Sequence, residues 1–334
     1  MIARRRLHEI VDGFAGRRVV VYGDLVLDRF VLGTPKRISR EAPVIILRFE
    51  EQRDLPGGGA NALANVAALG GTPLAVGVVG DDESGRALLA ALSAHGVECA
   101  DVVVEPGFRT ITKVRLLAGG PSALKFQVAR FDVEDHLSAG CHPDLGARLS
   151  RLAATAGAAA VSDYGYGAVT ADNVARLRAA LPPGALAVAD SRFSLFGIGQ
   201  VDGATPNLEE LAALAGRIPS SDGVVAAAAE ALRGRLGARF VVATRGSHGL
   251  SLVEAGRPPL HQPVFGTDQV ADVTGAGDTV LATIALALAA GAAPAEAATL
   301  ANLAGGVVVT KLGTATLAAE ELHQAIELAP FVGG

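Results

Sequence analysis

Cysteine is scarce in this sequence: only Cys99 and Cys141 occur among its 334 residues. Two cysteines provide no disulfide framework, so a reducing compartment, and hence a cytoplasmic location, is expected. The sequence also lacks an excess of positive charge, since its formal net charge is −5. It therefore has no basic footprint for nucleic acid or for an anionic membrane surface, and neither is expected as a partner.

Long hydrophobic runs are missing as well. The arginines at positions 4–6 are followed by a segment with polar side chains at 8, 9 and 12, which is unlike the apolar core of a secretory leader. The longest apolar helix candidate, Val280–Ala293, is too short and too rich in alanine to span a bilayer. The sequence therefore predicts a soluble protein without a membrane partner.

Hydrophobic residues are nevertheless plentiful, at 50% of the chain, which is enough for a large core. Apolar β-type runs alternate with alanine- and leucine-rich runs, a pattern typical of βαβ units. The expected strands are Val19–Tyr22, Leu74–Val79, Ala158–Val161, Ala185–Ala189 and Phe240–Ala243. The expected helices are Ala60–Leu69, Gly85–Ala94, Ala171–Ala180, Leu208–Ala215, Val224–Arg233 and Val280–Ala290. We therefore predict an α/β fold with a doubly wound, mostly parallel sheet flanked by helices, in a single domain over residues 1–334.

Two segments, Arg29–Arg53 and Thr110–Asp132, break this alternation. Both are β-rich and include proline or glycine turns, so we expect antiparallel strands outside the main sheet. They lie next to the expected ligand loops and are predicted to form a small β-sheet lid, near residues 30–50 and 108–132. Basic side chains recur along the second segment, at Lys113, Arg115, Lys125 and Arg130. Such charges suit either a substrate phosphate or the protection of exposed sheet edges.

Polar residues follow nearly every expected strand. They are Asp24, Asp81, Asp163 with Tyr164, Asp190, Asn207, and Thr244 with Arg245. In open parallel sheets, ligands bind beyond the carboxyl ends of the strands. A single residue of this kind is typical of a loop cap, but a row of them along one edge favours a ligand site.

The stretch Asp272–Thr279 places a carboxylate and two glycines at the start of an expected helix. The backbone N–H groups of Gly275, Ala276 and Gly277 can face one point there, and the partial positive charge of a helix N-terminus suits a phosphate or an oxyanion. Asp278, at the same place, is positioned to take a proton from an attacking hydroxyl. An anion site beside a base is the minimum equipment for phosphoryl transfer, whereas the motif alone also fits a simple N-cap.

A second glycine turn, Pro56–Asn61, opens another helix, and Asn61 and Asn65 share one face of it. Three glycines allow a ligand to approach the backbone closely, although such turns also occur without ligands. Asp28 is a short acceptor suited to paired sugar hydroxyls, or else a surface turn residue.

Two more motifs follow expected strands. Asn207 and Glu210, three residues apart at a helix start, fit either a hydrated Mg²⁺ or a capping box. The polar turn Thr244–Gly249 fits either a nucleotide phosphate or a plain loop. His248 within it has no second histidine or cysteine at metal spacing, so we assign it no ligand role.

Taken in this order, the motifs resemble those of the PfkB, or ribokinase-like, carbohydrate kinases. The resemblance runs from Arg18 to Thr316 and is carried by Gly23–Asp28, Pro56–Asn65, Asn207–Glu210, Thr244–Gly249 and Asp272–Asp278. It implies an ATP-dependent kinase acting on an alcohol acceptor, with a doubly wound α/β domain. It also implies a small β-sheet lid that often mediates dimers, so a homodimer through the lid is expected.

Within that family the chain looks most like the D-glycero-β-D-manno-heptose 7-phosphate kinases. The carriers are Gly23–Asp28, Arg37–Ser39, Glu41–Val44, Thr110–Lys113, Ser162–Tyr164 and Gly305–Thr314. Two departures lie near the phosphates in this resemblance: Asp190-Ser191-Arg192 replaces an expected Asp-Pro-Lys, and Tyr166 replaces an expected lysine. Some of these kinases continue into a nucleotidyltransferase domain, and an end at Gly334 leads us to expect that this second activity is absent.

The resemblance also implies roles for particular residues. Asp278 is the expected general base, and the backbone of Gly275, Ala276 and Gly277 the expected anion site. The residues expected to hold the sugar phosphate are Asp28, Gly58, Gly59, Asn61, Lys113 and Asp163. Those expected on the ATP side are Asn207, Thr244, Gly246, Gly249 and Asn302. The expected metal contacts are Asn207 and Glu210 for Mg²⁺, largely through water, and Asp272 and Thr274 for a monovalent cation such as K⁺.

Three other interpretations remain open at this point. The first is a PfkB kinase for another sugar, sugar phosphate or nucleoside. The second is a sugar- or nucleotide-binding protein without catalysis, although such a protein has no need for Asp278. The third is a dinucleotide-binding oxidoreductase, which the absence of a Gly-x-Gly-x-x-Gly motif after the first strand disfavours.

Overall fold

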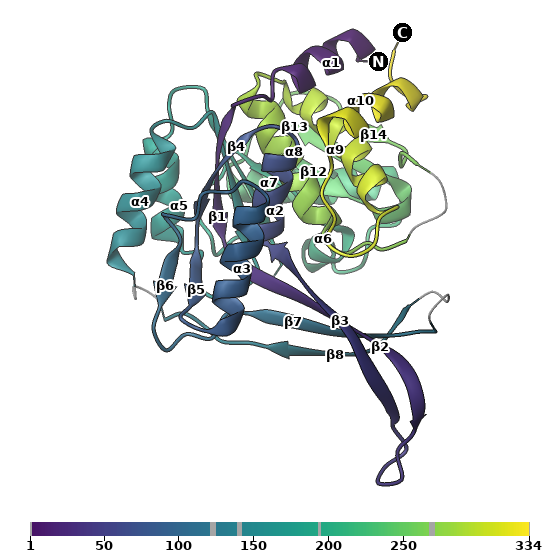
Figure 1. Ribbon diagram of the computed structural model, residues 1–334. Coiled ribbons are helices and arrows are strands. Elements are labelled where there is room, and N and C mark those ends of the chain that lie inside the picture. The colour runs from purple at the N-terminus through teal and green to yellow at the C-terminus, as the bar shows by residue number, and fades with distance from the viewer. Residues whose placement is uncertain (1, 121–124, 139–141, 193–194, 267–270, 334) are drawn as a thin grey trace.

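A computed structural model describes residues 2–120, 125–138, 142–192, 195–266 and 271–333. In this part of the chain, eight strands form the main sheet, in the order β14-β13-β12-β11-β10-β9-β1-β4 (Figure 1). The strands are β1 (Arg18–Gly23), β4 (Thr72–Val76), β9 (Ala158–Asp163), β10 (Leu186–Ser191), β11 (Gly203–Ala204), β12 (Phe240–Thr244), β13 (Leu250–Glu254) and β14 (Leu260–Gln262). All pair in parallel except β13 and β14, which add an antiparallel edge. The predicted doubly wound α/β fold is confirmed.

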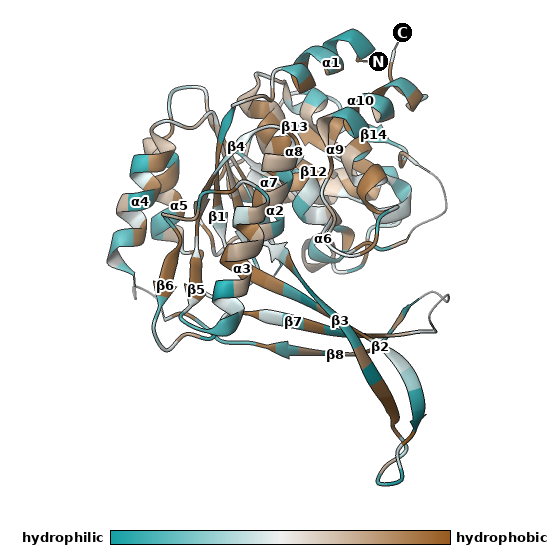
Figure 2. Cartoon of the chain, in the orientation of Figure 1, coloured by the Kyte–Doolittle hydropathy of each residue, from teal (hydrophilic) through white to brown (hydrophobic). Residues whose placement is uncertain are grey.

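Helices cover both faces of this sheet. The described helices are α1 (Arg4–Asp12), α2 (Gly59–Ala68), α3 (Glu83–Ala94), α4 (Pro143–Ala153), α5 (Ala171–Ala180), α6 (Leu208–Ala215), α7 (Asp222–Leu236), the short η1 (Gly246–His248), α8 (Ala276–Ala289), α9 (Pro294–Val308) and α10 (Ala319–Leu328). One core lies under α1–α3 and α8–α10, and the other under α4–α7. Alternate residues of β1 enter opposite cores, because strand side chains alternate between faces: Val19 and Val21 enter the first, and Val20 and Tyr22 the second. Figure 2 shows the resulting apolar character of α8 and α9.

The two segments that break the alternation form the predicted lid. It is a four-stranded sheet in the order β3 (Ile45–Gly58), β2 (Leu25–Ile38), β7 (Thr112–Ala118) and β8 (Phe126–Val133). The expectation of purely antiparallel pairing is wrong for the centre, because β2 and β7 are parallel. The chain leaves the body after β6 (Val103–Glu105) to reach β7, and so enters it in the same direction as β2. The β2–β3 hairpin projects well beyond the body (Figure 1).

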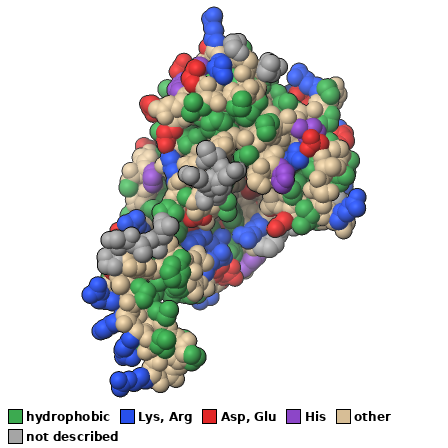
Figure 3. Space-filling view, turned by 90° about the vertical axis from the view of Figure 1, so that its right-hand side faces the viewer, with side chains coloured by type: hydrophobic (Ala, Val, Ile, Leu, Met, Phe, Trp, Pro, Cys, Tyr) green, Lys and Arg blue, Asp and Glu red, His purple; other side chains and the backbone are tan. Residues whose placement is uncertain are grey.

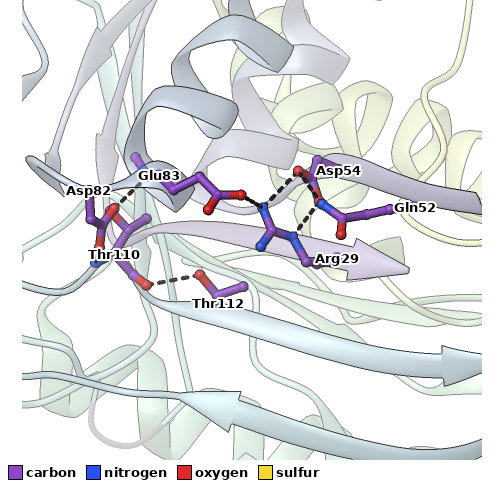
Figure 4. A network of polar contacts seen from close by, with 8 residues as sticks. Arg29, Gln52, Asp54, Asp82, Glu83, Thr110 and Thr112 are labelled. Atoms are coloured by element: carbon purple, nitrogen blue, oxygen red, sulfur yellow. Dashed lines mark hydrogen bonds and ion pairs between the residues drawn. The ribbon is translucent and has the colours of Figure 1, made fainter. Parts of the chain in front are cut away.

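Polar contacts tie the base of the lid to α3 (Figure 4). Across the hairpin, Arg29 Nε and Nη2 bind the Asp54 carboxylate at 2.7 and 2.9 Å, and Arg29 Nη2 lies 3.7 Å from Glu83. Asp82, the N-cap of α3, accepts hydrogen bonds from the Thr110 N–H at 2.9 Å and the Thr110 hydroxyl at 2.7 Å, just before β7. Each chain entry into the lid is therefore anchored to the start of the same helix.

The predicted strand Leu74–Val79 is divided in the structure. The chain bends at Gly77, where a Cβ would lie 2.7 Å from the Gly23 carbonyl oxygen. Beyond the bend, β5 (Val78–Gly80) pairs with β6 (Val103–Glu105) in a separate two-stranded sheet. Asp81 follows β5 and so does not lie on the ligand edge of the main sheet.

The composition led to expectations about the two cysteines and about membrane-spanning helices. Cys141 lies outside the described residues, and Cys99 is a partly buried free thiol. Among the helices that the structure describes, none combines the length and the apolar character needed to cross a membrane.

Candidate active site

The site centres on the N-terminus of α8. Gly275, the residue before the helix, has φ of +79°, and a Cβ there would lie 2.4 Å from Nδ2 of Asn61. Glycine is therefore required both for the backbone conformation and for the close approach of Asn61. Gly277 remains exposed, whereas the Ala276 N–H is directed to the Val273 carbonyl oxygen at 3.3 Å.

Asp278 lies on the first turn of α8 with 2% of its surface exposed. Its Oδ1 accepts a hydrogen bond from the Tyr164 hydroxyl at 2.9 Å, and its Oδ2 accepts one from Asn61 Nδ2 at 3.1 Å. Burial raises the pKa of Asp278 to about 7, against the lowering effect of these two hydrogen bonds. A carboxylate with a pKa near neutrality is well matched to general-base catalysis.

Asn61 is held in place by its own neighbours on α2. Its side-chain oxygen accepts a hydrogen bond from Asn65 Nδ2 at 3.1 Å, one helical turn away. Asn65 Oδ1 in turn accepts one from the Leu317 N–H at 3.3 Å. The predicted shared face of Asn61 and Asn65 is therefore present, but Asn61 turns its amide toward Asp278 and the Gly275 carbonyl oxygen. Its expected contact with the sugar stays a prediction.

A cavity of about 530 Å³ opens on one side of the α8 N-terminus. Its polar lining comes from the ends of neighbouring strands and from the start of α6, and includes Asp163, Tyr164, Asp190, Arg192, Asn207, Glu210 and Gly277. Burial raises the pKa of Asp190 well above its usual range, and the charges of Glu210 and Asp278 add to the effect. Four strand-end residues predicted from the sequence therefore meet in one cavity.

Asn207 and Glu210 form the capping box that the sequence left as an alternative to a metal site. Asn207 Oδ1 accepts from the Glu210 N–H at 2.9 Å, and Glu210 Oε2 accepts from the Asn207 N–H at 2.9 Å. Burial also raises the pKa of Glu210. In the described residues, no three His, Cys, Asp or Glu side chains are grouped to hold a metal ion directly. Any metal at this edge must therefore take most of its ligands from water and substrate.

A second cavity, of about 320 Å³, lies on the other side of Gly277. It brings together the four remaining residues predicted on the ATP side, Thr244, Gly246, Gly249 and Asn302. The rest of the lining is mainly small and apolar, from Leu250, Val264, Val273, Ala276, Val280, Ala301 and Val309. Asn302 donates a hydrogen bond to the Pro263 carbonyl oxygen at 2.8 Å and so fixes the wall of the cavity.

The lid contributes positive charge to the site. Arg115 forms a buried ion pair with Asp28 on the adjacent strand, and Lys113 lies with Nζ 4.9 Å from the centre of the Tyr164 ring. Burial lowers the pKa of Lys113, and so do the nearby charges of Arg192 and Arg130. Figure 3 shows lysine and arginine side chains in the recess between lid and body.

Some predicted residues have other roles in the structure. Asp24 binds the backbone N–H groups of Tyr164, Tyr166 and Ala168 at 2.8–3.1 Å and so shapes the loop after β9. Lys125 pairs with Glu50 on the outer part of the lid. Gly58 and Gly59 are buried against the Asp24 carbonyl oxygen. Their glycine identity is therefore explained by packing of the lid hairpin onto the body.

The candidate monovalent-cation residues form a closed turn. Asp272 Oδ1 accepts hydrogen bonds from the Thr274 N–H and hydroxyl at 2.9 and 2.7 Å. Asp272 Oδ2 accepts one from the Gly313 N–H at 3.0 Å. This carboxylate links the start of the α8 motif to the loop that follows α9.

The fold and the position of these cavities at the carboxyl ends of the strands define a ligand-binding α/β protein of the doubly wound class. The chain belongs to the pfkB family of carbohydrate kinases, whose family model matches residues 17–140 and 176–321.

Curated relatives and solved structures agree with this assignment. The chain is 41% identical over 321 residues to the bifunctional protein HldE of Caulobacter vibrioides and 41% identical over 313 residues to that of Azotobacter vinelandii. These alignments cover 95% and 92% of the chain but only 65% and 63% of the relatives, so the chain spans less than two thirds of their length.

Among solved structures, it resembles a ribokinase of Arabidopsis thaliana (TM-score 0.71, 22% identity, covering 94% of this chain and 100% of that one). It also resembles phosphofructokinase-2 of Escherichia coli (TM-score 0.74, 20% identity, covering 94% and 99%). At these identities the two structures support the fold.

Proposed function

We propose that this chain is an ATP-dependent sugar-phosphate kinase and that its acceptor is the anomeric hydroxyl of D-glycero-β-D-manno-heptose 7-phosphate. The observation that carries the proposal is the position of Asp278. Its carboxylate lies on the first turn of α8, with a pKa of about 7, and Gly277 beside it borders both cavities. A base placed between two cavities is suited to a reaction between two substrates.

The proposed transfer uses the chain's own groups in a simple order. The adenine of ATP occupies the smaller, apolar cavity, and the phosphates of ATP extend past Gly277. Asp278 removes the proton from the acceptor hydroxyl, whose oxygen forms a bond to the γ-phosphorus as the bond to the ADP oxygen breaks. The exposed backbone of Gly277, with Gly275 and the positive end of α8, stabilises charge on the transferring group, and the Ala276 N–H takes part once it leaves the Val273 carbonyl oxygen.

Mg²⁺ fits the oxygen donors at the edge of the larger cavity. Glu210 and Asn207 already bind each other, so a hydrated ion held mainly by water and nucleotide phosphate suits them better than direct ligation. When bound, Mg²⁺ would neutralise phosphate charge. We also propose Asp272 and Thr274 as part of a monovalent-cation site. A structure of Escherichia coli phosphofructokinase-2 is a complex with potassium, which makes K⁺ the ion to test.

A phosphorylated acceptor is supported by the charge of the lid. Lys113, Arg115, Arg130 and Arg192 lie around Asp28 and Tyr164, and two of these cations are more than nine-tenths buried. Asp28 pairs with Arg115 and Asp132 pairs with Arg130, so the four cations outnumber these two carboxylates, and buried cations need anionic partners. Arg192, where the resembled kinases have lysine, offers a planar fork that binds phosphate oxygens in pairs.

The deciding experiment compares kcat/KM for heptose 7-phosphate, unphosphorylated heptose, fructose 6-phosphate and ribose. We expect heptose 7-phosphate to be preferred, and preference for a free sugar or another sugar phosphate would move the chain to the wider family interpretation. Lys113→Met should lower kcat/KM for the phosphorylated acceptor by about 10- to 100-fold, as expected for loss of a charged hydrogen bond. Lys125→Met is the matched control, because Lys125 pairs with Glu50 away from the cavities.

We further propose that the protein acts in the cytoplasm as a homodimer joined through the lid. The outer lid exposes large apolar side chains, including Phe49 at 65% and Phe126 at 59%. Strand pairing places Phe49 opposite Gly33, Gly33 opposite Ala118, and Ala118 opposite Phe126, so one row crosses the sheet with a phenylalanine at each end. Gly33 and Ala118 in the middle of this row are buried, so the exposed phenylalanines at its two ends are the feature that favours association.

A further inference from the structure

We propose that Tyr164 is a positioning residue for Asp278: its hydroxyl fixes one carboxylate oxygen and keeps the carboxylate ready to accept a proton. This inference rests on the proposed kinase function, because it assigns Tyr164 a part in the proton-transfer step. In the sequence, Tyr164 is a polar residue after a strand and the end of the Ser162–Tyr164 motif that carries the resemblance, without an assigned role. The structure gives it a specific contact to the base.

The two oxygens of Asp278 are held by different elements. Tyr164, in the loop after β9, donates to Oδ1 at 2.9 Å, and Asn61 of α2 donates to Oδ2 at 3.1 Å. The backbone of Tyr164 is itself fixed, because its N–H donates to the Asp24 carboxylate at 2.8 Å. The carboxylate is therefore oriented by two donors, each of which is anchored to a rigid element.

The hydroxyl of Tyr164 can serve only as a donor toward Asp278 under ordinary conditions. Burial raises the pKa of Tyr164 well above its usual value, and the charges of Asp278 and Asp190 raise it further. The phenol thus stays protonated and favours the ionised form of Asp278, whereas burial of Asp278 favours the protonated form. Removal of the hydroxyl alone should make Asp278 harder to ionise.

The Tyr164 ring also connects the base to the lid. Lys113 of β7 lies over the ring with Nζ 4.9 Å from its centre, and a Cβ at Gly58 would approach the ring to 3.2 Å. The ring lines the larger cavity next to Asp163 and Asp190. One side chain therefore contacts the base, the lid cation and the cavity. Tyr164→Phe is the informative substitution, because it retains the ring and removes only the hydroxyl.

The test measures the pH dependence of kcat/KM for phosphoryl transfer in the parent and in Tyr164→Phe. The acidic limb should move to higher pH by about one unit, which corresponds to a roughly tenfold loss of kcat/KM at pH values below the limb. Activity above the limb should recover to within a few-fold of the parent. Tyr22→Phe is the matched control: its buried hydroxyl donates to the Ala168 carbonyl oxygen and accepts from the Thr170 N–H and Asn173 Nδ2, and it makes no hydrogen bond to Asp278. It should lower thermal stability but leave the acidic limb in place.

A second measurement separates this inference from the proposed function. The side-chain carboxyl of Asp278 can be titrated by ¹³C NMR, with its signal assigned by its loss in Asp278→Asn. A higher midpoint in Tyr164→Phe than in the parent supports the inference even if no tested sugar is phosphorylated. An unchanged midpoint, or superimposable pH profiles in an active enzyme, overturns it. Absence of kinase activity in the parent with a shifted midpoint refutes the function and leaves the Tyr164–Asp278 coupling standing.

Discussion

At the residue scale, the charge of Asp278 is set by opposing contributions. Burial favours its protonated form, and donors from Tyr164 and Asn61 favour the carboxylate. We predict that Asp278→Asn lowers turnover by about 10²- to 10⁴-fold, the usual cost of losing a general base, while ATP still binds. Steady-state kinetics and ATP titration test this. Asp81→Asn is the control, since Asp81 contacts surface Arg86, and turnover of Asp278→Asn within a few-fold of the parent would remove the base assignment.

The same pKa links catalysis to stability. The pKa of Asp278 rises from 3.8 to about 7 on folding, so between these pH values the native state keeps a proton that the unfolded state has released. The free energy of unfolding contributed by Asp278 therefore falls as pH rises through this window, by at most about 4 kcal/mol. We predict that Asp278→Asn, which carries no buried charge, has a smaller decrease in Tm from pH 5 to pH 8 than the parent. Equal decreases would contradict the raised pKa.

Gly275 provides a test of the anion site that does not alter a charged group. An alanine Cβ there would displace Asn61, whose amide lies 2.4 Å away, and would also strain a backbone with φ of +79°. Gly291 at the other end of α8 has φ of +85°, but a Cβ added there would meet no atom within 4 Å. We predict that Gly291→Ala loses about 1 kcal/mol of stability from backbone strain, and that Gly275→Ala loses at least as much because its Cβ also collides with Asn61. Only Gly275→Ala should also lose most of its kcat, and equal kcat in both would contradict the role of this close approach.

At the element scale, the βα alternation was readable because each unit carries its own local pattern. The sequence predicted α2, α3, α5–α8 and most strands of the main sheet. Each of these elements is indicated by the spacing of apolar residues within its own segment. It did not identify β11, which is two residues long, or the bend at Gly77, which depends on the distant Gly23 carbonyl. The parallel β2–β7 pairing was missed for a similar reason, since it joins segments about 85 residues apart and register is not encoded in either alone.

For the site too, the motifs could be predicted from the sequence, but the contacts between distant residues could not. Glycine motifs and strand-end residues located both cavities, because the carboxyl ends of parallel strands meet at one edge. The contact of Tyr164 with Asp278 joins residues 114 positions apart and has no local signal. Asn61 was predictable only in part. The helical face that it shares with Asn65 follows from the sequence, but the contact of its side-chain amide with Asp278 depends on how α2 packs against α8.

The attachment of the lid offers a prediction at this scale. Asp82 caps α3 through the Gly85 N–H at 2.7 Å and also binds Thr110 at the entry to β7. Thr170 caps α5 through the Asn173 N–H at 3.3 Å, and its side chain makes no described hydrogen bond to the lid. We predict that Thr170→Ala costs about 1 kcal/mol of unfolding free energy, the usual value of an N-cap, and that Asp82→Ala costs more, because it also removes the two hydrogen bonds from buried Thr110. Only Asp82→Ala should raise KM for the sugar phosphate, and an unchanged KM would show that the lid does not depend on this anchor.

At the scale of the whole molecule, the lid differs from the body in how much apolar surface it leaves uncovered. The body buries its large side chains between sheet and helices, whereas β8 and the outer part of β3 are exposed (Figures 1 and 2).

We therefore predict that the protein is a dimer in solution and that Phe49→Asp combined with Phe126→Asp makes it monomeric. A carboxylate at each end of the apolar row would have to lose its hydration on association, which costs several kcal/mol per buried charge. Leu328→Asp is the control, because Leu328 is 75% exposed and belongs to α10, which lies at the opposite end of the molecule from the lid (Figure 1). Light scattering after size exclusion gives the mass directly. A monomeric parent would refute the dimer, and a lid variant that stays dimeric would place the interface elsewhere on the molecule.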